Sequence, residues 1–294
     1  MSFRRSFATL AALTLVLAAC GGDDSSSDAD ASEGDELTLV EDPIMDTDEP
    51  DVVLPASTPT ELVITDVIVG DGPAAADGDT VFVNYVGVLS ADGSRFDGNY
   101  GSDPFDVTLG MGMVIKGWDQ GLIGMQAGGR RQLDIPADLA YGDREMGAAI
   151  PPNSALSFVV DMIAVVPATD AADEPSVDIS AADNVSELVI TDLIVGDGPV
   201  AEAGAKAVLH LVAFRADTAA QITSTWASPQ PLSFELSEGG TLPGLVAGIQ
   251  GMKVGGRRQL QVPFADAWGA EGQSDIGLPA EIDLIVVIDL LATF

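Results

Sequence analysis

The chain contains an internal duplication, and this feature constrains its fold more than any other. Residues 61–73 read ELVITDVIVGDGP and residues 187–199 read ELVITDLIVGDGP, so the two segments differ at a single position. A second shared segment, GGRRQL, occurs at 128–133 and again at 255–260. The copies lie about 126 residues apart, which is far longer than the repeat of a solenoid. The 294 residues therefore predict two domains of one fold.

The pattern within each copy is mostly that of β-strands. In the first copy, residues 81–89 (VFVNYVGVL) are rich in the β-branched and aromatic residues that strands favour. Residues 131–135 and 156–166 also predict strands. The last of these is almost continuously apolar, so we expect it to be a buried central strand.

A short helix is predicted between these strands. Ile115, Trp118 and Leu122 recur at three- and four-residue steps, which places them on one face of a helix. Gly117 and Gly121 lie inside it and lower its intrinsic stability, so packing against a sheet must hold it. The expected fold class is α+β, with a curved antiparallel β-sheet wrapped on a short α-helix in each copy.

The N-terminus has the pattern of an export signal. Arg4 and Arg5 precede an apolar run over residues 7–19, which is too short to span a bilayer but typical of a signal peptide. The run ends in LAAC, which resembles the lipobox of bacterial lipoproteins and implies a signal over residues 1–19 with lipidation at Cys20. An ordinary secretory signal is the alternative. The arginine pair also has a weak similarity to a twin-arginine signal, although the general export route is preferred.

The remaining segments complete the predicted domain organisation. Residues 20–57 are acidic and poor in apolar side chains, so they predict a disordered tether. The domains are expected at 58–167 and 185–294, with the polar segment 168–184 as the linker between them. The lipobox resemblance places the chain outside the cytoplasm. It would be anchored to the outer face of the cell membrane, or to the periplasmic side of an envelope membrane.

The composition excludes several classes of function. The 46 acidic and 12 basic residues give a formal net charge of −34, which argues against nucleic acid as a partner because phosphate binding needs basic patches. Cys20 is the only cysteine and His210 the only histidine. An intrachain disulfide is therefore impossible, and neither a usual zinc site nor a Ser-His-Asp set in a Gly-x-Ser-x-Gly context is present. No metal or cofactor is expected.

The first copy resembles the FKBP family, the macrolide-binding peptidyl-prolyl cis-trans isomerases, from about residue 62 to residue 166. The resemblance depends on ten positions that occur in the family's order and near-correct spacing. Among them are the segment VIKGWDQGL at 114–122, Tyr141-Gly142 and the loop end Ile150-Pro151-Pro152. The ten positions are Tyr85, Phe96, Asp97, Phe105, Val114, Ile115, Trp118, Tyr141, Ile150 and Phe158.

The resemblance implies a role for each of these residues. Trp118 would form the floor of an apolar pocket under the proline ring, and the other apolar residues its walls. The Ile115 backbone N–H and the Tyr141 hydroxyl would hold substrate carbonyls, and Asp97 would lie at the pocket edge near the Tyr85 hydroxyl. Without the resemblance, most of these residues would be read as plain core or turn residues. Ala149 departs from the larger aliphatic residue frequent in the family, so macrolide ligands are candidate partners of uncertain affinity.

The second copy lacks most of this pocket. Seven replacements follow from aligning the shared segments: Leu211 for Tyr85, Ile222 for Phe96, Thr223 for Asp97, Leu232 for Phe105, Leu245 for Trp118, Trp268 for Tyr141 and Val286 for Phe158. The Ile-Pro-Pro run becomes Gly277-Leu278-Pro279. The second copy is therefore expected to be a degenerate domain that folds without the pocket's polar groups. It is either purely structural or an apolar surface that holds unfolded clients.

The predicted function is that of a membrane-anchored peptidyl-prolyl cis-trans isomerase. It would accelerate X-Pro isomerisation in proline-containing, unfolded or exported polypeptides, with the activity in the first domain. The alternative is a chaperone or interaction module that binds clients without catalysis. A purely structural envelope protein is a third alternative, against which the preserved pocket argues.

Overall fold

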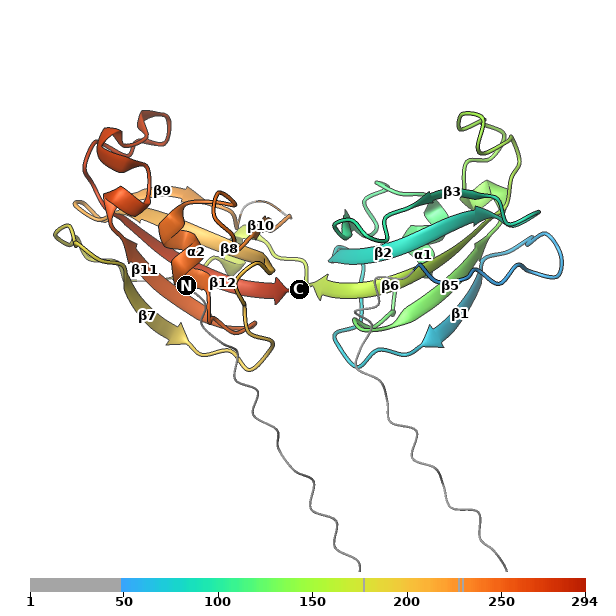
Figure 1. The fold of residues 1–294 in the computed structure, drawn as a ribbon, viewed down its shortest axis with the longest axis horizontal. Helices are drawn as coiled ribbons and strands as arrows, with labels where there is room; N and C mark the ends of the chain where they lie inside the picture. The colour runs from blue at the N-terminus through green and yellow to red at the C-terminus, as the bar shows by residue number, and fades with distance from the viewer. Residues whose placement is uncertain (1–48, 177, 227, 229) are drawn as a thin grey trace, which may run out of the picture. The chain divides into compact units, whose positions relative to one another are not determined.

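The computed structural model describes residues 49–176, 178–226, 228 and 230–294. The first copy forms a six-stranded antiparallel sheet with the order β1-β5-β6-β2-β3, in which β4 also pairs with β2. The sheet curves around a short helix, α1 (Figure 1). The elements are β1 (Val63–Ile68), β2 (Thr80–Leu89), β3 (Arg95–Gly98), β4 (Phe105–Thr108), α1 (Lys116–Gly121), β5 (Arg130–Ile135), the 3-10 turn η1 (Ala137–Leu139) and β6 (Leu156–Val166).

The second copy repeats this arrangement element by element. Its strand order is β7-β11-β12-β8-β10, and β9 also pairs with β8. The elements are β7 (Val189–Ile194), β8 (Lys206–Arg215), β9 (Gln221–Ser224), β10 (Leu232–Glu235), α2 (Pro243–Ile249), β11 (Arg257–Val262), the 3-10 turns η3 (Phe264–Asp266), η4 (Gly269–Glu271) and η5 (Ser274–Ile276), and β12 (Leu284–Thr293). The short turn η2 (Ala171–Asp173) precedes it in the linker. The predicted α+β class and the duplication are both confirmed.

The three predicted strands are present nearly as the sequence indicates. The apolar run at 156–166 is β6, which lies between β5 and β2 and is buried along almost its whole length. Its successive side chains are buried on both faces of the sheet, so an alternating pattern is not required. β2 is the other long strand, and it pairs with β4 near its start and with β3 near its end.

The glycines of α1 are explained by the closeness of the helix to the sheet. A Cβ atom at Gly117 would lie 2.4 Å from Ile135 on β5, and one at Gly121 would lie 2.7 Å from Leu133. Gly244 in α2 meets Val262 in the same way, at 2.2 Å. The glycines lower the helix propensity but allow the backbone to pack directly on the strand. Packing therefore holds the helix, as the sequence predicts.

The second arginine of the repeated pair bonds both the helix and the edge strand β1. Arg131 Nε donates a hydrogen bond to Asp66 Oδ1 on β1 at 2.6 Å, and its Nη1 donates to the carbonyl oxygen of Gly121 at 2.8 Å. The last carbonyls of a helix have no partner within the helix, so this contact satisfies one of them. Arg258 makes the equivalent bonds in the second copy. The GGRRQL segment is therefore structural in both copies.

The end of the predicted tether packs on the first domain. Residues 49–57 belong to the segment predicted as disordered, yet the backbone N–H and carbonyl of Val53 both bond the Gln132 side chain on β5. Val52 packs on the outer face of the sheet. The Val53 backbone bonds and the packing of Val52 therefore hold this end of the segment on the domain.

The predicted signal peptide, Cys20 and most of the tether lie outside the described residues. Within the described part of the chain, no helix combines the length and apolar character that crossing a bilayer requires.

Candidate active site

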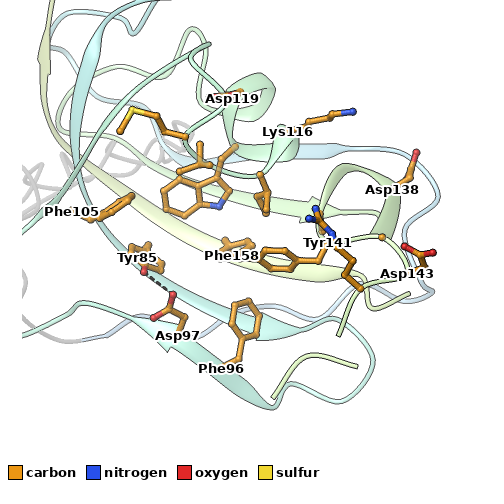
Figure 2. A pocket seen from close by; sticks show the side chains of 18 residues that line it. Tyr85, Phe96, Asp97, Phe105, Lys116, Asp119, Asp138, Tyr141, Asp143 and Phe158 are labelled. Atoms are coloured by element: carbon orange, nitrogen blue, oxygen red, sulfur yellow. Dashed lines mark hydrogen bonds between the residues drawn. The ribbon is translucent and has the colours of Figure 1, made fainter. Parts of the chain in front are cut away.

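A cavity of about 680 Å³ opens between the concave face of the first sheet, α1 and the loop after η1. Nine of the ten residues singled out in the sequence line it, and they come from β2, β3, β4, α1, β6 and the loops (Figure 2). They are Tyr85, Phe96, Asp97, Phe105, Val114, Ile115, Trp118, Tyr141 and Phe158. Segments far apart in the sequence therefore converge on one apolar space.

Trp118 is the centre of the aromatic lining. Its side chain is almost fully buried, at 3% exposure. Its ring lies edge-on to Tyr85 at 5.1 Å between centroids and edge-on to Phe158 at 5.4 Å. Phe96 in turn lies edge-on to Phe158 at 5.5 Å. Edge-to-face pairs at these separations are favourable for aromatic rings, so the lining is rigid.

One glycine on β2 makes room for two of these rings. A Cβ atom at Gly87 would lie 2.7 Å from Phe158 Cε1 and 2.8 Å from Phe96 Cζ. Gly87 pairs with Phe158 on one side and with Asp97 on the other. A glycine is thus needed at position 87 because the two rings of the cavity wall occupy the space of a side chain, and not because the backbone turns there.

The polar edge of the cavity is formed by two tyrosines and one carboxylate. The Tyr85 hydroxyl donates to Asp97 Oδ2 at 2.9 Å, drawn as the dashed line in Figure 2. Burial, followed by the hydrogen bond to Asp97, raises the pKa of Tyr85 above its ordinary value. Burial and the nearby Asp97 charge also raise the pKa of Tyr141. Both hydroxyls therefore stay protonated and able to donate at neutral pH.

Ile115 sits where the chain enters α1. It is the N-cap residue, with an extended backbone conformation and no side-chain cap. The first N–H groups of a helix have no partner within the helix, so they are available to an acceptor in the cavity. The Trp118 indole N–H is buried without a hydrogen-bond partner among the described residues. The floor and the helix entrance together can offer donors to a bound amide.

Ile150 does not line the cavity, in contrast to its predicted position in the wall. It is 6% exposed and packs in the core with Trp118 and Phe158. Its carbonyl accepts a hydrogen bond from the Met146 N–H, and this bridge closes the loop that follows Tyr141. Ile150 therefore supports the wall residues from behind.

Several lining residues are absent from the sequence prediction. Met113 is one of them, and its side chain is 58% exposed although it is large and apolar. Its position directly before Val114 could have indicated it. The charged residues of the mouth have no comparable signal, because isolated charged side chains are usually only solvated. They are Lys116, Asp119, Asp138, Asp143 and Arg144.

The sheet register of the second copy fixes the residues that stand at the cavity positions. Val286 pairs with Ala213 as Phe158 pairs with Gly87, so the sequence alignment of Val286 with Phe158 holds. Leu245 follows the start of α2 as Trp118 follows the start of α1. The second copy thus has Leu245 and Val286 where the first copy has Trp118 and Phe158.

Among the described residues, no three acidic or histidine side chains lie close enough together to hold a metal ion.

Comparison with known proteins identifies this architecture. The sequence matches the family of FKBP-type peptidyl-prolyl cis-trans isomerases over residues 72–163 and again over 198–291. An FK506-binding protein of Streptomyces anulatus is 48% identical over 124 residues, which are 41% of this chain and the whole of that protein. The peptidyl-prolyl cis-trans isomerase FKBP53 of Arabidopsis thaliana is 45% identical over 109 residues, which are 36% of this chain but only 23% of that protein.

Among solved structures, a peptidyl-prolyl cis-trans isomerase from Pseudomonas syringae pv. tomato is 36% identical, with 35% of this chain and 74% of that chain covered and a TM-score of 0.33. The two family matches coincide with the two sheets and their helices. The chain therefore belongs to the FKBP-type peptidyl-prolyl cis-trans isomerases and carries two FKBP domains.

Proposed function

We propose that the first domain catalyses X-Pro isomerisation and that the second does not. The observation that carries this proposal is the contrast between equivalent positions. The first domain has a cavity lined by Trp118, Phe158 and the Tyr85–Asp97 pair. Leu245, Val286, Leu211 and Thr223 stand at those positions in the second. The replacements keep apolar area but remove the orienting hydroxyl and carboxylate.

The cavity suits the chemistry of the proline amide. Rotation about this bond has a barrier of about 18–20 kcal/mol because it breaks amide resonance, although the cis and trans forms are close in free energy. Water stabilises the planar, polarised amide more than the twisted one. An apolar site that removes this water therefore favours the twisted transition state.

The residues of the first domain divide this work. Trp118 and Phe158 would receive the proline ring, and the Ile115 N–H and the Tyr141 hydroxyl would hold flanking carbonyls. The Tyr85–Asp97 hydrogen bond fixes one edge of the wall. No covalent intermediate or proton transfer is needed.

We further propose that the protein acts outside the cytoplasm, anchored by lipid on Cys20. The LAAC segment at the end of the apolar run supports this proposal, as does the acidic stretch that follows it. Each buried methylene of an acyl chain contributes about 0.8 kcal/mol, so several chains together would hold the protein at the membrane. Its clients would be exported polypeptides whose folding waits on proline isomerisation.

The catalytic assignment is tested in the full chain with a refolding or protease-coupled assay on a proline-limited substrate. Tyr85→Leu combined with Trp118→Leu gives the first domain the residues of the second, and should reduce turnover to background. Tyr141→Phe keeps the packing and removes only the hydroxyl, so a loss of up to about tenfold is expected. Trp268→Leu removes an aromatic ring from the second domain at the position equivalent to Tyr141 and is the matched control, expected to leave turnover unchanged.

Thermal melts separate loss of chemistry from loss of fold in these variants. Normal turnover in a cooperatively folded Tyr85→Leu, Trp118→Leu protein would place catalysis outside the first cavity. A large loss in Trp268→Leu would instead assign a share of turnover to the second domain.

A further inference from the structure

A short segment ahead of the first domain is fastened across the outside of its sheet. Glu49 accepts two hydrogen bonds from the Arg95 guanidinium, both at 2.8 Å. The Val53 N–H donates to Gln132 Oε1 at 3.2 Å, and Gln132 Nε2 donates back to the Val53 carbonyl at 2.7 Å. Between these anchors, Val52 packs with a small apolar cluster on the outer face that includes Val86, Val88 and Val159. We refer to residues 49–53 as the strap.

The second domain repeats the glutamate contact of the strap. Residues 49–52 read EPDV and residues 174–177 read EPSV, at nearly the spacing of the longer repeats. Glu174 accepts a hydrogen bond from the Ser224 hydroxyl at 2.6 Å and another from Gln221 Nε2 at 3.3 Å. Both partners lie on β9, the counterpart of β3. The contact between this glutamate and the edge strand therefore occurs in both copies, although the cavity residues differ.

The strap contacts β3, a short edge strand of the cavity wall that pairs with one neighbouring strand. β3 has four residues, lies at the edge of the sheet and pairs only with β2, through Val86, Gly87 and Val88. Two of those partners, Val86 and Val88, belong to the outer-face cluster on which Val52 packs. Arg95 begins β3, and the next two residues are Phe96 and Asp97 of the cavity.

We propose that the strap positions β3, with Glu49 as the positioning residue that fixes Arg95 and thereby holds Phe96 and Asp97 at the cavity. The strap lies near the end of the predicted tether, so it connects the acidic residues before it to the wall of the cavity. This inference rests on the proposed activity of the first domain, but its structural part is measured separately.

The test replaces residues 49–53 with an equally long Gly-Ser stretch in the full chain. The same replacement at residues 42–46 is the matched control, because it changes the tether and spares the strap. Replacing the strap should lower kcat/KM by about three- to tenfold and raise amide hydrogen exchange over residues 95–98. The control replacement should change neither quantity.

Charge reversal isolates the contribution of Glu49. An exposed ion pair is weak, so Glu49→Arg alone should lower kcat/KM by no more than about threefold. Arg95→Glu in the same chain should restore both the rate and the exchange of β3, because it re-forms the pair in reverse. Asp51→Arg makes the same charge change two residues away and should have no effect.

The outcomes distinguish the two proposals. Two results together support the strap: faster exchange of β3 when the strap is replaced, and normal exchange when Arg95→Glu is added to the Glu49→Arg variant. These results would support the strap even if neither the unmodified chain nor any variant isomerised proline. A lack of isomerisation would overturn only the proposed activity. Unchanged exchange over 95–98 overturns the strap. Faster exchange with an unchanged kcat/KM also overturns its role in positioning the cavity wall.

Discussion

Adding a single methyl group at Gly87 should damage the site without touching any of its polar atoms. The new Cβ would lie 2.7 Å from Phe158 Cε1 and 2.8 Å from Phe96 Cζ, where ordinary contacts begin at 3.4 Å. The two rings must therefore retreat by about 0.6–0.7 Å. Because they also contact each other edge-on, neither can move alone.

The cost of this shift can be bounded from two opposing effects. Overpacking a well-filled site destabilises by about 1–3 kcal/mol. Replacing glycine by alanine in a strand regains about 0.5–1 kcal/mol of backbone entropy. The net loss of stability should be about 0–2.5 kcal/mol, which lowers the melting temperature of a domain of this size by as much as about 10 °C. If the catalytic transition state is destabilised by a free energy near the middle of this range, kcat/KM falls by about tenfold.

The assay compares Gly87→Ala with Ala213→Gly in otherwise intact chains. Ala213 occupies the equivalent place in the second domain, with Val286 and Thr223 as its cross-strand partners. Its replacement should cost only about 0.5–1 kcal/mol of backbone entropy and leave turnover unchanged. Turnover is measured well below the melting temperature, with near-UV circular dichroism as a check on packing. Full activity and unchanged stability in Gly87→Ala would refute the claim that this glycine shapes the wall.

Four further outcomes are expected. Cys20→Ser should release the protein from membranes or leave the signal uncut, whereas an unmodified thiol on membrane-bound mature protein would contradict the anchor. Turnover should stay level between about pH 6 and 9, because the raised pKa values of Tyr85 and Tyr141 keep both hydroxyls protonated; a tenfold change in that interval would show that another group titrates in the mechanism. The folded state also holds these protons more tightly than the unfolded one, so their contribution to stability is complete below about pH 10 and is lost as the pH rises further. Residues 170–294 alone should melt cooperatively and give only background isomerisation, and turnover equal to the first domain would disprove the loss of function. A chelator should leave the rate of the full chain intact, and a chelator-sensitive rate would require a metal site that the cavity does not explain.

Much of the fold could be predicted because its signals are local. The apolar run of β6, the β-branched and aromatic residues of β2, and the three- and four-residue steps around Trp118 can each be recognised within one segment of the sequence. The duplication then extended every assignment to the second copy. The glycines of α1 appeared unfavourable in the sequence, and only the distance to β5 explains them.

The remaining features depend on contacts that a linear pattern does not carry. The family resemblance predicts Ile150 in the cavity wall, whereas the structure places it in the core, in a loop closed by its bridge to Met146. The strap follows an acidic segment, and its own sequence gives no sign of a fixed position. The contacts of Glu49 with Arg95 and of the Val53 backbone with Gln132 join residues 46 and 79 positions apart.

The closeness of α1 to the sheet limits how this domain can be redesigned. Gly117 and Gly121 leave no space for a side chain between helix and strand, so Trp118 sits at a depth that the backbone fixes. Any larger residue at either glycine would lift the helix and make the cavity shallower. A protein engineer who wants to admit a bulkier ligand must therefore work on the exposed rim, where Met113 and the loop after Tyr141 have solvent to expand into.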